Sequence, residues 1–295
     1  VYLPAADETL YVLSDIHGDL ISLDNILKEI GFFENMRSTN PSIRLVILGD
    51  YINSGTNTLG VLIRVMQLKK DYPNNVILTR GNNEVAHYYN TVSLRKLNEE
   101  AAKHNEELLE VFGHIKEEYH FTLELGAKYG VESIPGIFEK LLEFFELLPA
   151  AVVTGNGIIM AHSAPPHNPK VNLLDIAESD DLAHEMMHNS TWDDKISPNE
   201  YHRPRYEAYK IRKEGFSDFL NNIGANIFVG GHVSINANKR QFENKMVILH
   251  STNVGSKECG YYLYQQGVGS GSYGVFSLDR RYDSISENNI KPVPA

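Results

Sequence analysis

The sequence contains one cysteine, Cys259, among its 295 residues. A single thiol cannot form an internal disulfide, and such low cysteine usage is typical of proteins in a reducing compartment. A chain of this length buries a core large enough to fold without covalent cross-links. We therefore expect one large domain, or two small ones, in the cytoplasm.

Long apolar runs are also missing. No stretch of about eighteen apolar residues occurs, so the sequence predicts no membrane-spanning helix. The first residues, VYLPAADETL, contain neither a basic region nor an apolar core and do not have the pattern of a secretory signal.

Positive charge is in short supply. Lysine and arginine number 27 against 38 aspartate and glutamate residues, which gives a net charge of −11. Such an acidic balance argues against a nucleic-acid-binding surface. It also disfavours the steering of polyanionic substrates, unless bound cations reverse the sign locally.

Strands and helices alternate in the first part of the sequence. Apolar runs predict buried strands at residues 9–13, 43–50 and 75–81, and amphipathic patterns predict helices at 19–33 and 58–73. The second strand, at 43–50, is continuously apolar instead of alternating, as in parallel sheets that are covered on both faces. This β-α-β-α-β order predicts a parallel sheet with right-handed crossovers.

The rest of the chain continues the α/β pattern and contains one unusual segment. Residues 86–130 are charged, leucine-rich and almost free of proline and glycine, which predicts an inserted pair of helices. An amphipathic helix at 136–149 and a hairpin at 151–162 follow, and a further helix is predicted at 205–222. Four more apolar runs predict strands, at 226–232, 245–251, 261–266 and 273–279. We find no linker and predict one domain over residues 1–295, with a helical insertion at about 86–130.

Polar side chains follow the apolar strands at the points where the strands end. The motifs at these points are SDIHGD, GDYINSG, RGNNE, MAHSAPP and VGGHVS. In open α/β sheets, binding sites form at the carboxyl ends of the strands. Residues able to bind metal in these motifs are Asp15, His17, Asp50, Asn82, His162 and His232.

This set of residue types suits divalent metal ions. Two aspartates, one asparagine and three histidines can hold one or two such ions. Asp50 could bridge two ions, and a water shared by them would be strongly acidified. Asp15 and His17 lie two residues apart, so an extended backbone would turn both side chains to the same side.

Taken in order, the motifs resemble those of the phosphoprotein phosphatases, a family of metallophosphoesterases. The family pattern is GDxHG, GDxxDRG, GNHE, HGG and GH, and this sequence has SDIHG, GDYINSG, GNNE, HSA and GGH. Similar flanking segments extend the resemblance over most of residues 9–280. The resemblance implies an α/β fold, the metallophosphoesterase α/β/β/α sandwich, in which two packed mixed sheets are flanked by helices.

The resemblance also implies roles for the ligand-type residues. A first metal ion would be held by Asp15, His17 and Asp50. A second ion would share Asp50 and add the ligands Asn82, His162 and His232. Manganese suits this mixed imidazole and carboxylate set, with iron or zinc as alternatives. In the family, a water that bridges the metals lies in line with phosphorus.

Three residues depart from the family pattern. Asn83 stands where the family has the histidine that protonates the leaving alcohol, and Asn53 stands where it has the aspartate that orients this histidine. Ser54 replaces an arginine that grips phosphate. An amide cannot deliver a proton to an alkoxide at neutral pH, so general acid catalysis is lost. We therefore expect the two amides to weaken activity.

Four explanations of these amides stay open. The pair could be isosteric substitutions that trap a complex, or it could mark a phosphodiesterase, whose leaving groups need less protonation. The protein could instead be a slow monoesterase, or a pseudophosphatase that binds a phosphorylated partner without turnover. We favour a metal-dependent protein phosphatase that acts on phosphoserine, phosphothreonine or phosphotyrosine.

Other residues are candidates for the missing functions. His250 follows a strand near the expected site and is a candidate substitute acid. Arg80, Arg203 and Arg205 are candidates for the phosphate grip, beside Ser54. The helical insertion is a candidate docking surface for a protein partner. Comparable insertions occur in bacterial effector phosphatases of the family, and for such an effector the location would be a host cytosol.

Overall fold

The fold is described from a computed structural model. The structure describes residues 9–85, 120–191, 209–233, 238–252, 258–265, 272–277 and 291–292. Across these residues, no helix combines the length and the apolar character that a membrane span requires. Most of the predicted insertion, and with it the partner surface expected there, lies outside the described residues, as do Arg203 and Arg205.

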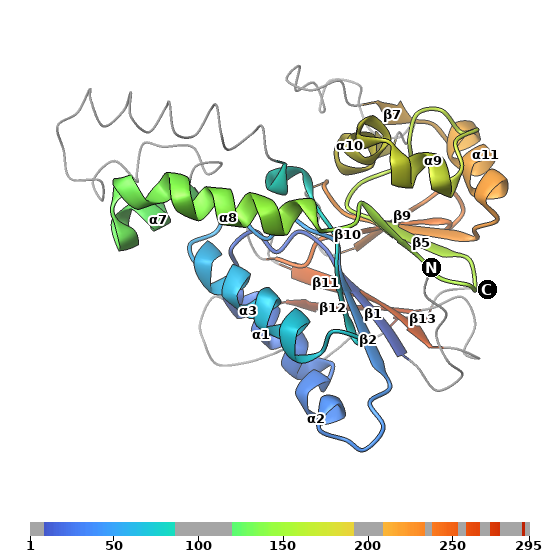
Figure 1. The fold of residues 1–295 in the computed structure, drawn as a ribbon. Helices are drawn as coiled ribbons and strands as arrows, with labels where there is room; N and C mark the ends of the chain where they lie inside the picture. The colour runs from blue at the N-terminus through green and yellow to red at the C-terminus, as the bar shows by residue number, and fades with distance from the viewer. Residues whose placement is uncertain are drawn as a thin grey trace.

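Two sheets form the centre of the molecule (Figure 1). The first contains β1 (Thr9–Leu13), β2 (Ile43–Ile47), β3 (Val76–Leu78), β11 (Glu258–Gln265), β12 (Ser272–Ser277) and β13 (Lys291–Pro292). The second contains β4 (Ala151–Val153), β5 (Ile158–Ala161), β8 (Ile227–Gly230), β9 (Asn238–Gln241) and β10 (Met246–Leu249). Their strand orders are β13-β12-β11-β1-β2-β3 and β4-β5-β8-β10-β9. Both sheets are mixed, because antiparallel strands flank the parallel sets β1-β2-β3 and β5-β8-β10.

The two sheets pack face to face through an apolar layer. Leu10 and Val12 of β1 meet side chains of the second sheet such as Met160 and Val229, and all four are fully buried. The opposite faces of the sheets are covered by helices, so these strands are buried on both sides. That explains their continuous apolar runs.

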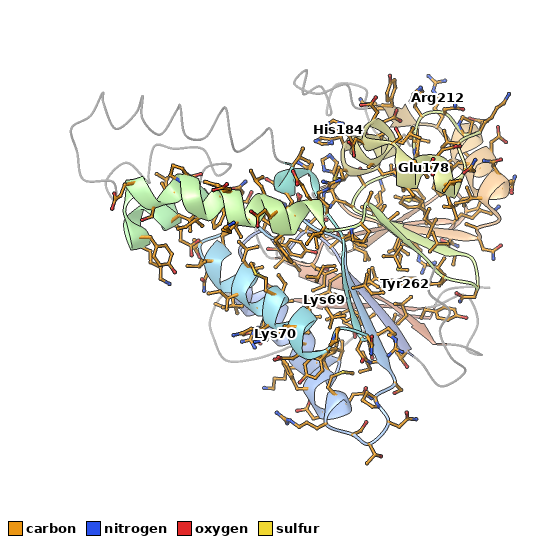
Figure 2. All side chains as sticks on the ribbon, viewed as in Figure 1. Lys69, Lys70, Glu178, His184, Arg212 and Tyr262 are labelled. Atoms are coloured by element: carbon orange, nitrogen blue, oxygen red, sulfur yellow. The ribbon has the colours of Figure 1, made fainter. Side chains whose placement is uncertain are left out.

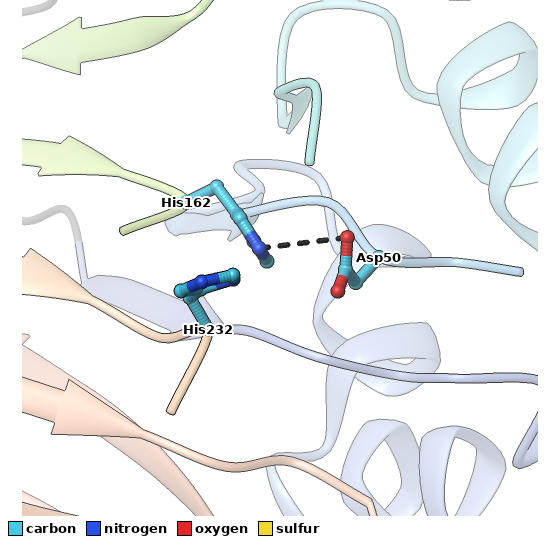
Figure 3. A group of neighbouring side chains, drawn as sticks. All are labelled: Asp50, His162 and His232. Atoms are coloured by element: carbon cyan, nitrogen blue, oxygen red, sulfur yellow. Dashed lines mark ion pairs between the residues drawn. The ribbon is translucent and has the colours of Figure 1, made fainter. Parts of the chain in front are cut away.

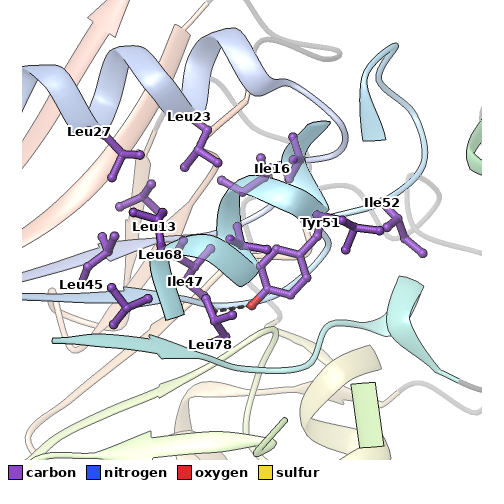
Figure 4. Close-up of a cluster of buried hydrophobic side chains, with 14 of the residues drawn as sticks. Leu13, Ile16, Leu23, Leu27, Leu45, Ile47, Tyr51, Ile52, Leu68 and Leu78 are labelled. Atoms are coloured by element: carbon purple, nitrogen blue, oxygen red, sulfur yellow. Dashed lines mark hydrogen bonds between the residues drawn. The ribbon is translucent and has the colours of Figure 1, made fainter. Parts of the chain in front are cut away.

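Helices on the outer face of the first sheet enclose a second core. They are α1 (Leu20–Glu29), α2 (Phe32–Met36), α3 (Thr58–Asp71), α7 (His120–Tyr129) and α8 (Ile134–Glu146), the last preceded by the short helix η4 (Val131–Ser133). Leu23 and Leu27 of α1 lie in this core with Leu45 of β2 (Figure 4). The polar face of α3 carries Lys69 and Lys70 in its last turn (Figure 2).

The second sheet has its own helical cover. The helices are α9 (Leu173–Glu178), α10 (Asp180–His188) and α11 (Lys213–Ile223), and a small pair of strands, β6 (Ser190–Thr191) and β7 (Lys210–Ile211), lies beside them. Phe216 and Phe219 of α11 pack with Phe228 of β8 in a third core. The layers are therefore helix, sheet, sheet and helix, which confirms the predicted fold class.

The predicted β-α-β-α-β start is confirmed, with one difference. Residues 19–33 do not form one helix, because Gly31 adopts a left-handed conformation (φ 61°) between α1 and α2. Asp19 begins α1, since its carboxylate accepts the backbone N–H of Ser22 at 3.0 Å. This cap starts the helix directly after the polar turn that follows β1.

The helix predicted at 205–222 begins later than expected. Residues 205–208 lie outside the described residues, Lys210 and Ile211 form β7, and the helix starts at Lys213. β7 pairs in parallel with Ser190 and Thr191. A strand that depends on a partner so far away along the chain leaves no local periodic signal, and for this reason the sequence pattern did not indicate it.

The last helix of the predicted insertion belongs to the core. Phe121, Leu123 and Leu125 of α7 are fully buried with the residues under α3. Glu124 accepts the backbone N–H of Thr58 at 2.9 Å and that of Leu59 at 3.1 Å. These two donors are at the N-terminus of α3, where no intrahelical partner exists. α7 therefore caps the helix that follows the 51–57 loop.

Removing this cap should destabilise the protein. Glu124→Ala leaves two N–H groups without their acceptor, and we expect the free energy of unfolding to fall by about 1–3 kcal/mol. Glu124→Gln keeps one acceptor oxygen and should lose less. Urea unfolding followed by circular dichroism measures both changes, with Glu139→Ala on the exposed face of α8 as the control. Equal midpoints for Glu124→Ala and the control would contradict the cap.

Candidate metal centre

The candidate ligands converge at one edge of the sandwich. Asp15 and His17 follow β1, Asp50 follows β2 and Asn82 follows β3, while His162 and His232 follow β5 and β8 of the second sheet. Metal-binding atoms form two groups, each within 4.8 Å, that share one residue. The groups are Asp15, His17 and Asp50, and Asp50, His162 and His232. The structure thus brings ligand-type side chains of both sheets around Asp50.

The group of Asp50, His162 and His232, together with Asn82, gathers several atoms that carry lone pairs. His162 Nδ1 lies 3.0 Å from Leu48 O, so this nitrogen carries the hydrogen and Nε2 is left as an acceptor. Asn82 Oδ1 lies 2.9 Å from His162 Nε2 and 3.0 Å from His232 Nδ1. His162 Nε2 is also 3.4 Å from Asp50 Oδ1 (Figure 3). An amide turned the other way would donate to these atoms, whereas a divalent cation would select the oxygen. The donor set fits a metal ion.

The group on the first sheet is joined through backbone contacts. His17 Nδ1 lies 3.3 Å from Ile52 O, which leaves Nε2 toward Asp50 Oδ2 at 3.5 Å. The backbone N–H of His17 also donates to Asp50 O at 2.7 Å. Asp15 accepts the backbone N–H of His232 through both oxygens, at 3.0 and 2.9 Å. Asp15 therefore links the ends of β1 and β8 as well as offering a ligand atom.

The backbone around the centre is strained. Six candidate residues have φ between 48° and 69°, the left-handed region that non-glycine residues rarely adopt. These are Asp15, His17, Asp50, Asn53, Ser54 and His232. The expectation that an extended backbone aligns Asp15 with His17 is therefore wrong, although both do reach Asp50. Such strain costs on the order of 1–3 kcal/mol per residue and gathers at functional sites.

Glu84 is an important residue that the motif analysis did not single out. Its carboxylate accepts the backbone N–H groups of Asp50 at 2.8 Å, Tyr51 at 2.9 Å and Gly81 at 3.0 Å. It is fully buried and ties the loop after β2 to the loop after β3. Gly81 permits this approach, because a Cβ there would lie 2.4 Å from Asp50 Oδ1. A glutamate directly after two asparagines in RGNNE was the available signal.

Burial and neighbouring charge shift the ionisation of the centre. Burial first, and then the charge of Asp50, raises the pKa of Glu84 to about 8. Burial also acts to raise the pKa of Asp50, but the neighbouring His162 and His17 outweigh it and the pKa is lowered. Burial and the proximity of His162 lower the pKa of His232 to about 3. His232 is thus neutral at pH 7, as a metal-binding imidazole must be.

The raised pKa of Glu84 predicts a loss of stability with rising pH. The folded-state value of about 8 lies above the ordinary 4.5, so its contribution is complete below pH 4.5 and is lost as pH rises through about 8. Measured in chelator, wild type should lose on the order of 4 kcal/mol relative to Glu84→Gln between pH 4.5 and pH 9. Added Mn²⁺ should reduce this loss, because a cation at Asp50 offsets the repulsion. Parallel stability profiles for the two proteins would contradict the prediction.

Asn53 and Asn83, which stand where the family has an aspartate and the histidine acid, contact one another. Asn53 Nδ2 donates to Asn83 Oδ1 at 3.0 Å, and Asn83 Nδ2 donates to Asp50 Oδ2 at 2.7 Å. The backbone N–H of Asn83 adds a bond to Asp50 Oδ1 at 3.0 Å. The structure therefore brings Asn53, Asn83 and Asp50 into one hydrogen-bonded chain. Both polar groups of the Asn83 side chain are engaged within the protein.

The other candidate residues within the described ranges lie in loops and at strand ends. Ser54 is half-buried in the loop next to Asn53, and Arg80 follows β3 with its backbone N–H donating to Pro149 O at 3.1 Å. His250 is buried at the end of β10. Its neighbour Ser251 donates to Ser14 O at 2.9 Å, so this stretch is fixed to the loop after β1. The roles of all three stay predictions.

Two further histidines lie near the centre and were not predicted from the sequence to be there. His184 and His188 lie one turn apart on α10, with stacked rings 3.9 Å apart (Figure 2 labels His184). His188 is buried, and its ring centre is 6.4 Å from that of His232. Its Nδ1 donates to His184 O at 2.9 Å, and burial lowers its pKa to about 4. The i, i+4 spacing in HEMMH was the signal that could have indicated this pair.

Comparison with known proteins identifies the family. The family model described as calcineurin-like phosphoesterase matches residues 9–235, which include all the candidate metal ligands. The chain belongs to the calcineurin-like phosphoesterases. This membership confirms the resemblance inferred from the motifs and makes the protein a member of a hydrolase family.

Individual relatives agree with this assignment. A serine/threonine-protein phosphatase of Caenorhabditis elegans is 24% identical over 156 residues, which are 53% of this chain and 27% of the relative. A probable serine/threonine-protein phosphatase of Encephalitozoon cuniculi is 24% identical over 271 residues, which are 89% of this chain and 51% of the relative. This calcineurin-like phosphoesterase thus spans from about a quarter to about half of the length of these relatives.

A solved structure shows the same fold. A protein serine/threonine phosphatase from Saccharomyces cerevisiae superposes with a TM-score of 0.66 at 19% identity, covering 89% of this chain and 74% of that one. At this level of identity the likeness concerns the fold alone. The calcineurin-like phosphoesterase fold therefore extends over most of the chain.

Proposed function

We propose that this chain is a metal-dependent phosphoesterase that hydrolyses phosphate monoesters on proteins. The observation that carries the proposal is the pair of ligand groups that share Asp50. A carboxylate common to two groups is the arrangement that a two-metal hydrolytic site needs. The family membership supports hydrolysis of a phosphate ester as the reaction.

The chain offers a complete set of side chains for two ions. Asp15, His17 and Asp50 would hold the first ion. Asp50, Asn82, His162 and His232 would hold the second. Mn²⁺ suits this mixture of imidazole, amide and carboxylate ligands, with iron or zinc as alternatives. Two such ions supply Lewis acidity and lower the pKa of water.

Protein substrates are proposed from the relatives. The matched proteins of Caenorhabditis elegans and Encephalitozoon cuniculi are named serine/threonine-protein phosphatases. The identity of about 24% supports a phosphoprotein substrate as a class and no particular target. The low cysteine content supports action in the cytoplasm, or in a host cytosol if the chain is an effector. Arg80 and Ser54, with Arg203 and Arg205, are proposed to contact the phosphate.

A second candidate function is a pseudophosphatase that binds a phosphorylated partner. The Asn53–Asn83 pair favours it, because neither amide can act as a general acid. A phosphodiesterase is a further alternative for the same reason. The three functions differ in what they turn over, so they can be separated by direct assay.

The test begins with the purified protein and Mn²⁺. Metal analysis should find close to two ions, and p-nitrophenyl phosphate should be hydrolysed with release of inorganic phosphate seen by phosphorus-31 NMR. Phosphorylated proteins should be dephosphorylated, and bis-p-nitrophenyl phosphate should react more slowly. Tight binding of phosphopeptides without turnover of any ester would establish the pseudophosphatase instead. Faster cleavage of the diester would establish the phosphodiesterase.

A further inference from the structure

We propose that this site selects phosphate esters by the acidity of the alcohol they release, and that phosphotyrosine is its preferred protein substrate. The inference rests on the proposed phosphatase function and specifies its substrate class. It follows from how Asn53 and Asn83 are held, and from the hydrogen bonds that the neighbouring histidine and tyrosine side chains make within the protein.

The residue in the acid position has no proton to give. Asn83 accepts from Asn53 Nδ2 and donates to Asp50 Oδ2, at 3.0 and 2.7 Å. A side-chain amide donates hydrogen bonds but does not ionise at neutral pH. Because the oxygen and the nitrogen of the Asn83 amide both form hydrogen bonds within the protein, the amide is also poorly placed to order a water molecule that could protonate the leaving group.

Among the described residues, four hydrogen-bearing groups around the centre direct their hydrogens into contacts within the protein. The Nδ1 atoms of His162 and His17 are paired with Leu48 O and Ile52 O, and their other nitrogens face Asp50. A neutral His188 directs its single N–H to His184 O. The Tyr51 hydroxyl donates to Thr79 O at 2.8 Å, and its ring lies among the apolar side chains of the core (Figure 4). None of these four groups can serve as a proton donor without breaking a contact.

The chemistry of ester cleavage then favours one class of substrate. The oxygen of water forms a new P–O bond, the ester P–O bond breaks, and its electron pair goes to the leaving oxygen. One proton of the attacking water passes to solvent, and the other stays on the inorganic phosphate that is released. Without an acid, the leaving oxygen departs as an anion and is protonated afterwards. Tyrosine has a pKa of about 10, whereas a serine hydroxyl is a far weaker acid, comparable to water itself.

The expected preference is large and lies in turnover. A general acid contributes typically about 10²–10⁴-fold, chiefly for the poorer leaving group. We therefore expect kcat for a phosphotyrosine peptide to exceed that for the matching phosphoserine peptide by about 10²–10⁴-fold. Binding should hardly differ, since the phosphate contacts are the same for both. The preference for tyrosine thus arises from the missing acid and needs no dedicated tyrosine pocket.

The experiment compares peptides of one sequence that carry either phosphotyrosine or phosphoserine, with the Mn²⁺-loaded full chain. Calorimetry with the corresponding phosphonate peptides, in which CH₂ replaces the ester oxygen, measures binding independently of turnover. We expect dissociation constants within a few fold of each other and the stated difference in kcat. A series of aryl phosphates should react faster as the phenol becomes more acidic.

The outcomes separate this inference from the proposed function. Equal turnover of the two peptides, or rates independent of the acidity of the phenol, would overturn the inference while leaving a phosphatase in place. That result would point to another donor, with His250 as the first to replace. A preference that appears in binding instead of kcat would overturn it as well. Absence of turnover of any ester by the metal-loaded protein would overturn both proposals.

Discussion

Asp50→Ala should remove most of the bound metal and abolish hydrolysis of p-nitrophenyl phosphate. Asp50 is the one residue common to both ligand groups, and it is almost completely buried between His17 and His162. Even partners that only orient a ligand typically change metal affinity by about 10–100-fold, so loss of a shared ligand should exceed that range. Metal content, measured after dialysis against low Mn²⁺, should fall from close to two ions to well below one.

The control for this change is an aspartate of the same chain outside the centre. Asp218→Ala, on the exposed face of α11, should keep full metal content and activity. Asp50→Asn preserves the shape of the side chain and one of the two acceptor oxygens that Asn83 uses, but it removes the charge and should also lose metal. Circular dichroism establishes that each variant is folded. If Asp50→Ala retains both ions while folded, the shared-ligand arrangement is wrong.

The location of this site could be predicted from the sequence because strand ends carry a strong local signal. Each continuously apolar strand is followed by a polar motif, and parallel strands place their carboxyl ends at one edge. Asp15, Asp50 and His162 therefore met as expected. The order of the motifs along the chain was enough for this prediction, and the pairing of the strands within each sheet did not need to be known.

The parts that the sequence did not indicate depend on contacts between distant segments. Glu84 acts through three backbone N–H groups, two of them in another loop, and its place in RGNNE does not by itself say which groups it binds. β7 exists because of its pairing with β6. The left-handed φ of Asp15 and His17 is imposed by their connections to Asp50 and β8, so local preference pointed to the wrong conformation.

The contact between Asn53 and Asn83 suggests how the missing acid could be restored. The double change Asn53→Asp and Asn83→His would put a carboxylate and an imidazole where two side chains already lie 3.0 Å apart. The carboxylate would orient the ring and raise its pKa, so that it carries a proton at neutral pH. Hydrolysis of an alkyl phosphate should then rise by about 10²–10⁴-fold. The gain on p-nitrophenyl phosphate should be much smaller, because that leaving group departs without protonation.

Three comparisons test whether the gain in alkyl phosphate hydrolysis comes from an added proton donor. Asn83→His alone should gain less, since Asn53 cannot supply the negative charge that raises the pKa of the ring. Asn53→Asp alone should gain nothing, because no acid is added. Metal content should stay unchanged in all three variants, as neither residue belongs to the ligand groups around Asp50. A double variant that holds two ions yet gains nothing on an alkyl phosphate would show that position 83 is not the acid position. The absence of a phosphate-gripping arginine at Ser54 would then be the better explanation of slow turnover.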